Sequence, residues 1–197
     1  MVGGQKIVRA EIPAELRDAL VGNLRGVERA IVKEEKTSAA GELLPDYVYV
    51  KHAYGYPKSL RLITDALWEA VRDDGANWVV GAGHGGLGIA SILAKDHDLY
   101  YTMVRDELSG HGMGSWLDGY DRPTIDDRIV FVDDVLTTGG SIIKMKGKVV
   151  EETDRLGLPR PGIAGAVVVA KRGDGRKLLG EGDIPFVKYL LTREDLL

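Results

Sequence analysis

The sequence contains no cysteine, so disulfides and thiolate zinc sites are excluded and cysteine usage gives no information on the redox compartment. No apolar run approaches the roughly 20 residues of a membrane span. The first residues, Met-Val-Gly-Gly-Gln-Lys, lack the apolar stretch of a signal peptide. Basic residues are not in excess, because the formal net charge is −4, so there is no electrostatic footprint for nucleic acid. We therefore expect a cytoplasmic protein that binds neither membranes nor nucleic acid.

The length of 197 residues, 44% of them hydrophobic, suits a single α/β domain. Residues 1–50, with helical spacing over 12–32 and a strand over Tyr47–Val50, form a small N-terminal segment, and 51–197 form the core. Strands near residues 78, 99, 129 and 163 alternate with helices or a long loop, which predicts a central parallel sheet flanked by helices. A last strand follows Ile184. In such sheets the chemistry gathers at the carboxyl ends of the strands.

The stretch from Arg128 to Ser141 carries the strongest pattern. Ile129–Val132 predicts a strand buried on both faces, and Asp133 and Asp134 stand where it is expected to end. Thr-Thr-Gly-Gly-Ser at 137–141 then leads into an amphipathic helix, and such a loop directs N–H groups toward a phosphate. The two carboxylates would repel that phosphate but suit the hydroxyls of a ribose. The alternative is a strand–turn–helix that carries two acids by chance, at a cost unless they have partners.

This stretch resembles the phosphoribosyl-pyrophosphate (PRPP) signature of the type I phosphoribosyltransferases, and the chain is most similar to the orotate enzymes. The resemblance implies the fold of that family, with a small N-terminal hood and a flexible catalytic flap. It implies that Asp133 and Asp134 hold the ribose and act in catalysis. The residues it assigns to the 5′-phosphate are Thr137, Thr138, Gly139, Gly140 and Ser141.

A second glycine-rich turn, Gly81–Gly86, lies between the strand at 78–80 and an apolar helix expected from about Leu87. Its spacing is also that of a dinucleotide-binding fingerprint, with Asp106 as the ribose-binding acid. The resemblance implies a different role, in which the turn cradles the pyrophosphate of PRPP with His84, Gly85 and Gly86. His84 is either a donor to a phosphate oxygen or a solvated turn residue.

Residues 105–127 are long for a plain connection and predict a lid or binding loop. Val-Arg-Asp-Glu-Leu-Ser-Gly-His-Gly at 104–112 resembles the flap of the orotate enzymes, Val-Arg-Lys-Glu-x-Lys-x-His-Gly. The resemblance implies that Arg105 acts in catalysis and PRPP binding and that His111 acts in catalysis when the flap closes. Asp106 and Ser109 depart from it, since the family has lysines at both places.

The apolar strand Ile163–Ala170 is followed by Lys171-Arg172-Gly-Asp-Gly. In the orotate enzymes a strand of this type ends in an arginine that pairs with the orotate carboxylate, which implies that Arg172 binds the base. The alternative is an exposed loop arginine. Lys36 is a second base-contacting candidate on a looser alignment. On the helix after Ser141, the three lysines Lys144, Lys146 and Lys148 are interpreted as a solvated face.

The resemblance implies transfer of phosphoribosyl from PRPP to orotate, with PRPP and orotate as substrates. Mg²⁺ is the implied cofactor, held mainly through substrate and water with no direct protein ligand. A flap that reaches a neighbouring subunit implies a homodimer. Three alternatives stay open: a purine or uracil phosphoribosyltransferase, a PRPP-binding regulator with little catalysis, and a nucleotide-dependent oxidoreductase.

Overall fold

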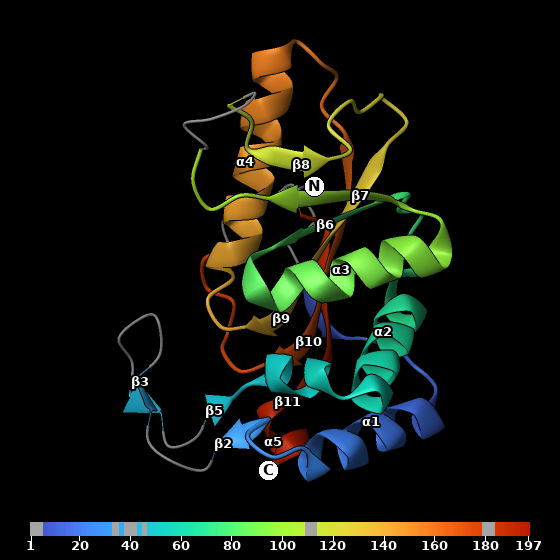
Figure 1. Ribbon diagram of the computed structural model, residues 1–197, viewed down its shortest axis with the longest axis vertical. Helices are drawn as coiled ribbons and strands as arrows, with labels where there is room; N and C mark the ends of the chain where they lie inside the picture. The colour runs from blue at the N-terminus through green and yellow to red at the C-terminus, as the bar shows by residue number, and fades with distance from the viewer. Residues whose placement is uncertain (1–5, 33–35, 38–42, 45–46, 109–113, 179–183) are drawn as a thin grey trace.

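In the computed structural model the protein forms one mixed, mainly parallel sheet between helices (Figure 1). The structure describes residues 6–32, 36–37, 43–44, 47–108, 114–178 and 184–197. The sheet strands, in spatial order, are β1 (Lys6–Arg9), β11 (Phe186–Thr192), β10 (Gly162–Lys171), β9 (Arg128–Leu136), β6 (Trp78–Ala82), β7 (Tyr100–Val104) and β8 (Leu117–Gly119). All neighbours run parallel except β7 and β8. The predicted parallel sheet is confirmed.

The central strands β9 and β10 are apolar because helices cover both of their faces. One face packs on α2 (Pro57–Val71) and α3 (Gly83–His97), with α1 (Ala14–Gly26) outside α2. The other face packs on α4 (Gly140–Leu156), and Phe131 and Met145 are buried between them. Pro57 at the start of α2 has its ring where a helix needs no N–H, and Gly157 ends α4 in the left-handed conformation.

The N-terminal segment holds short elements that lie outside the main sheet. They are β2 (Ile31–Val32), β3 (Lys36–Thr37), β4 (Leu43–Leu44), β5 (Tyr47–Val48) and the 3₁₀ helix η1 (Val50–Gly55). β2 pairs with β5, and β3 pairs with β4. The helix expected over 12–32 is shorter than predicted, because the chain turns through Arg29 at φ 65° into β2. The strand expected over 47–50 stops at Val48 and gives way to η1.

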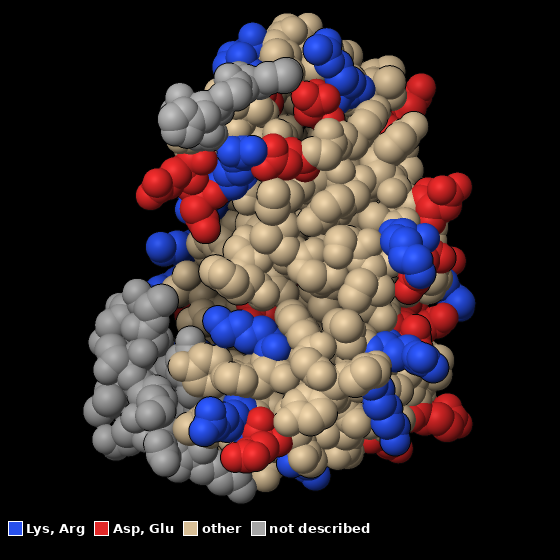
Figure 2. All heavy atoms as spheres, in the orientation of Figure 1, with Lys and Arg blue, Asp and Glu red and all other residues tan. Residues whose placement is uncertain are grey.

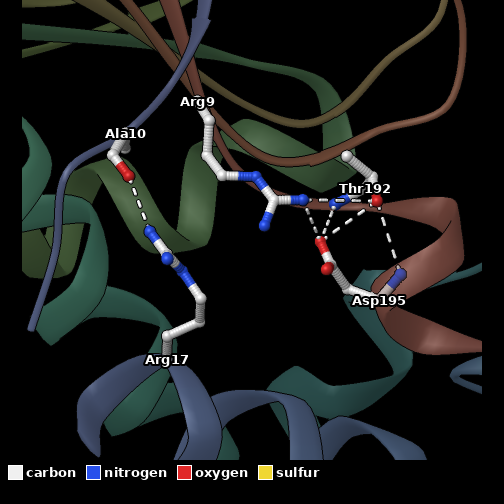
Figure 3. A network of polar contacts seen from close by, with 5 residues as sticks. All are labelled: Arg9, Ala10, Arg17, Thr192 and Asp195. Carbon is white, nitrogen blue, oxygen red and sulfur yellow. Dashed lines mark hydrogen bonds and ion pairs between the residues drawn. The ribbon is translucent and has the colours of Figure 1, made fainter. Parts of the chain in front are cut away.

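The chain ends in α5 (Arg193–Leu196), which is tied to β1 at the sheet edge (Figure 3). The carboxylate of Asp195 accepts from the Thr192 N–H at 2.6 Å and from Arg9 Nη2 at 2.7 Å. In return Thr192 caps the helix by accepting from the Asp195 N–H. Arg17 of α1 donates to the carbonyl of Ala10, so the first helix is fixed to the same corner.

Figure 2 shows acidic and basic side chains interspersed over the face turned to the viewer. None of the described helices combines the length and apolarity needed to cross a membrane.

Candidate active site

The acid pair lies where β6 ends, although the sequence had placed it at the end of β9. The pairing of β6 with β9 stops at Gly81 and Val132, whereas β9 continues along β10 as far as Leu136. Asp133 and Asp134 therefore stand on a strand that has lost one neighbour. That loss opens space at the carboxyl edge of the sheet. The prediction that β9 ends at Val132 is wrong, because β9 stays paired with β10 as far as Leu136.

The two carboxylates are directed to different helices. Asp133 is 8% exposed and lies near Ser141 at the start of α4. Burial and then the charge of Asp134 raise the pKa of Asp133 to about 7, although hydrogen bonds from the Asp134 N–H and from Ser141 oppose the rise. Asp134 faces α3, since a Cβ built at Gly85 would lie 2.4 Å from its Cγ. Polar groups of a ligand can thus meet a carboxylate on either side of the strand.

Tyr54 of η1 was not selected from the sequence, yet it borders the acid pair. Its hydroxyl donates to the carbonyl of Gly85 at 2.8 Å. Burial, followed by the charges of Asp134 and Asp133, raises the pKa of Tyr54 above its usual value, so the hydroxyl stays protonated. Tyr54 thereby fixes the first turn of α3 against the N-terminal segment. Its place in an aromatic-rich stretch gave no signal of this contact.

The predicted phosphate loop, Thr137 to Ser141, is held from behind by the segment after β10. The N–H of Gly175 donates to the Thr137 carbonyl, and that of Lys177 to the Thr138 carbonyl, both at 2.9 Å. Gly139 has φ 85°, a conformation that residues with a side chain rarely adopt. It also packs against Leu178, which leaves no room for a Cβ. No described side chain caps α4. A helix N-terminus without a side-chain cap suits an anion, because its first N–H groups lack helical partners.

The glycine-rich turn after β6 is tighter than expected, because α3 begins at Gly83 rather than near Leu87. Gly83, at φ 59°, allows the chain to pass directly from strand to helix. A Cβ at Gly86 would lie 2.5 Å from the Val132 carbonyl oxygen, so α3 rests on β9 itself. Gly85 and Gly86 thus bring a second helix N-terminus to the acid pair, while His84 is exposed.

A cavity of about 320 Å³ joins these parts. It is lined by Ala82, Gly83, Gly85, Asp106, Asp133, Gly140, Ser141 and Lys144. The turn after β6, Asp133 of the acid pair, the phosphate loop and the base of the predicted flap therefore meet around one space. A larger cavity, of about 640 Å³, lies between α1 and α2 and is lined by none of the predicted residues. Volume alone would have selected a cavity that the predicted residues do not line.

At the base of the predicted flap, Arg105 forms a two-point ion pair with Asp118 of β8. Its Nε lies 2.6 Å from Oδ2, and its Nη2 lies 2.7 Å from Oδ1. β8 falls inside the segment 105–127, so part of the predicted flap is an edge strand. A strand of three residues has too little alternation to be detected from sequence. His111, with Ser109, lies outside the described residues.

The lysines of α4 were interpreted from the sequence as a solvated face. The structure corrects this, because Lys148 is buried. Lys148 is 8% exposed, and its Nζ donates to the carbonyls of Arg105 and Asp106. The same Nζ lies 4.0 Å from the ring centroid of Trp116. Lys144 pairs with Asp106 at 2.7 Å and lines the cavity. Neither residue was predicted to belong to the site.

Arg172 lies beside the phosphate loop but does not line this cavity. Its N–H donates to the Leu136 carbonyl at 2.9 Å, and the next residue, Gly173, packs on Thr137. Arg172 lines a separate cavity of about 310 Å³ with Thr192, Arg193 and Glu194 among its neighbours. Lys36 lies on β3, and its side chain is outside the described residues. The structure therefore places Arg172 at a cavity separate from the one that Asp133 lines.

Comparisons with known proteins agree with this arrangement. No family model matches the chain. Orotate phosphoribosyltransferase from Methanosarcina acetivorans is 32% identical over 162 residues, which covers 82% of this chain and 81% of that protein. The enzyme from Pyrococcus furiosus is 32% identical over 133 residues, covering 66% and 68%. The crystal structure of orotate phosphoribosyltransferase from Aeropyrum pernix superposes with a TM-score of 0.71 at 30% identity, covering 90% of this chain and 96% of that one.

The chain belongs to the orotate phosphoribosyltransferase family. This result favours the phosphoribosyltransferase interpretation of Gly81–Gly86 over a dinucleotide fingerprint. Asp106 stands where the flap pattern given above for the orotate enzymes has a lysine. In the structure that acid is paired with Lys144.

Proposed function

We propose that the chain transfers the 5-phosphoribosyl group of PRPP to N1 of orotate, giving orotidine 5′-monophosphate and pyrophosphate. Its relatives named orotate phosphoribosyltransferase support this activity. The observation that carries the proposal is the single cavity bordered by two helix N-termini and a buried carboxylate. Such a cavity suits a sugar with a phosphate at each end.

The proposed reaction breaks the bond between ribose C1 and the pyrophosphate oxygen, and the electron pair leaves with pyrophosphate. Orotate N1 loses its acidic proton to water or to the departing pyrophosphate, and its lone pair forms the new bond to C1. Positive charge grows on the ribose, and negative charge grows on the leaving group. Asp133 and Asp134 would orient the ribose and oppose the first charge, and the first turn of α3 would meet the second.

The 5′-phosphate would be held by the N–H groups and hydroxyls of residues 137–141. This anchor lies far from the reacting bond, so it would bind substrate and transition state alike. Its backing by the Gly175 and Lys177 N–H groups keeps it in place before substrate arrives. Arg105 and His111 would reach the pyrophosphate when the flap closes, and closure would exclude water. His84 would donate to a phosphate oxygen from the rim.

Mg²⁺ is the proposed cofactor, and the residues present fit a metal held mainly by substrate and water. No group of three or more His, Asp or Glu side chains within the described ranges is arranged to hold a metal. Phosphate, ribose and water oxygens are the hard ligands that Mg²⁺ prefers, so no direct protein ligand is required. When bound, the metal would neutralise charge on the pyrophosphate.

For the base, we propose Arg172 and Lys36, on the resemblance alone. Arg172 could pair with the orotate carboxylate only if the base spans from C1 past the phosphate loop to its separate cavity. We further propose a cytoplasmic homodimer in which the flap reaches the neighbouring site. Sedimentation at micromolar concentration tests the dimer, and a monomer with full activity would contradict it.

Pyrophosphate release from PRPP and Mg²⁺ tests the activity directly. Release should require orotate, with uracil, adenine and xanthine far less effective. Arg172→Ala should raise the KM for orotate, and equal action of variant and wild type would overturn the base assignment.

A second candidate is motivated by Asp106 and Ser109, which replace the flap lysines: a PRPP-binding regulator with little catalysis. Tight binding of PRPP without release by any base would favour it.

A further inference from the structure

The flap of this chain lacks the two lysines that the resemblance leads one to expect beside the leaving group. Asp106 reverses the charge at one of the two positions, and Ser109 is neutral at the other. A pyrophosphate that leaves with additional negative charge needs a cation close by. Of the described residues that line the cavity, Lys144 alone carries a cationic side chain.

We propose that Lys144 of α4 is the residue that neutralises the pyrophosphate of PRPP, in place of the flap lysines. Asp106 holds it at the cavity wall until substrate binds. The proposal rests on the proposed function and names a contact for it that lies outside the flap. In this proposal a helix carries the cation that the flap loop was expected to carry.

The placement of Lys144 follows from the helical repeat. Gly140, Lys144 and Lys148 are spaced by four residues, so they share one face of α4. Gly140 lies at the start of this face, beside the predicted phosphate loop, and Lys148 lies about two turns further along, where it binds the carbonyl of Asp106. Lys144 stands between them, one turn from the helix N-terminus, with Gly83 and Gly85 lining the same cavity.

Lys148 fixes the geometry of the pair. Its ammonium group binds the carbonyls of Arg105 and Asp106 while its stem is buried beside Trp116. The backbone at Asp106 is therefore attached to the same helix face that carries Lys144. The ion pair between Asp106 and Lys144, at 2.7 Å, is a consequence of that attachment.

The ion pair itself is weak, which suits an exchange of partners. The side chain of Lys144 is 51% exposed and that of Asp106 is 72% exposed. Exposed pairs of this kind contribute little to folding because water screens them. Lys144 can therefore leave Asp106 for a more highly charged phosphate, and a flexible stem with a compact ammonium group allows the movement.

The position favours pyrophosphate over the 5′-phosphate. The 5′-phosphate is expected on the loop before α4, whereas Lys144 lies a turn further along the helix, beside the flap base. His84, on the pyrophosphate turn, is close enough to Asp106 for its charge to contribute to the lowered pKa of that acid, after the larger effect of Lys144. Lys144 thus borders the turn assigned to pyrophosphate.

The test compares Lys144→Gln with Lys146→Gln, which removes the same charge from the same helix but not from the cavity lining. The inhibition constants of pyrophosphate and of ribose 5-phosphate are measured against PRPP for each. Lys144→Gln should raise the KM for PRPP and the inhibition constant of pyrophosphate at least tenfold. It should leave that of ribose 5-phosphate within twofold, and Lys146→Gln should change neither.

Two further variants separate charge from structure. Lys144→Arg should recover most of the pyrophosphate affinity, and Asp106→Asn should strengthen it severalfold by releasing Lys144. Equal behaviour of the two Gln variants, or a loss confined to ribose 5-phosphate, would overturn the proposal. Calorimetry with pyrophosphate and Mg²⁺ gives the same comparison without turnover. If the wild type has no transferase activity, that result refutes the proposed function alone. The calorimetric comparison still decides whether Lys144 binds pyrophosphate.

Discussion

The carboxylate of Asp134 lies directly over the backbone of Gly85, at a distance that leaves no room for a side chain. A Cβ at Gly85 would meet Oδ1 of Asp134 at 2.4 Å. One acid of the pair proposed to bind the ribose thus lies against a glycine in the first turn of α3, some fifty residues earlier in the chain. The two sequence motifs form one site through this contact.

Gly85→Ala should therefore displace Asp134 and lower kcat/KM for PRPP about 100-fold, equivalent to roughly 2.7 kcal/mol of transition-state binding. Gly88→Ala is the matched control, because it lies on the same helix with nothing within 4 Å of its Cβ. The control should keep wild-type kinetics. Equal kinetics of the two variants would show that Asp134 is not needed in its present position.

The stability of the protein should depend on pH through Asp133. Its folded pKa of about 7 lies above the ordinary value of 3.8, so between these values the folded state binds a proton that the unfolded state lacks. Stability should fall as pH rises through this window and level off above it. Asp133→Asn removes this titration. The free energy of unfolding of the variant, taken relative to the wild type, should therefore rise by about 2 kcal/mol between pH 5 and pH 8.

Urea unfolding of both proteins across that range measures the difference. Asp65→Asn, at an exposed position, should keep a constant offset from the wild type. A constant offset for Asp133→Asn as well would mean that the acid is ionised throughout.

Arg105 must leave Asp118 if it is to reach the pyrophosphate. Both side chains are about one-third exposed, at 37% and 36%, so the pair contributes at most about 1 kcal/mol. Asp118→Asn should lower the KM for PRPP about two- to fivefold, and Arg105→Gln should raise it. Steady-state kinetics measure these KM values. Asp126→Asn, at an exposed position, is the control, because it removes the same charge as Asp118→Asn. A higher KM in Asp118→Asn would show that the pair orients Arg105 productively.

The corner around Asp195 should be a stabilising site remote from the acid pair. Its carboxylate accepts from the Thr192 N–H, the Thr192 hydroxyl and Arg9. Asp195→Ala should cost about 1–3 kcal/mol of unfolding free energy, because a helix cap and a charged hydrogen bond are lost together. Arg9→Ala should cost less, since that guanidinium is exposed. Chemical denaturation ranks the two, and the reverse order would contradict this assignment.

The elements predicted well from the sequence are those whose signal is local. β9 and β10 are continuous apolar runs, and α2 begins at a proline and shows one apolar face, so their places followed from composition alone. β8 was missed because its three residues, Leu117–Gly119, are defined by pairing with β7 and not by their own pattern.

The motifs of the site were predicted, but their relation in space was not. That Asp133 and Asp134 have no paired strand on the β6 side depends on β6 ending before β9, which is a property of two strands together. The contact of Lys148 with Trp116 and the flap carbonyls joins residues distant in sequence, so the lysines of α4 were taken for a solvated face. Lys144 could have been selected from its four-residue spacing to Gly140.

A crystal structure of the chain with PRPP and Mg²⁺ tests the central claim most directly. We expect the ribose hydroxyls within hydrogen-bond distance of Asp133 and Asp134, with the 5′-phosphate on the N–H groups of residues 138–141. PRPP bound in another cavity, or with its ribose turned away from both carboxylates, would contradict the account.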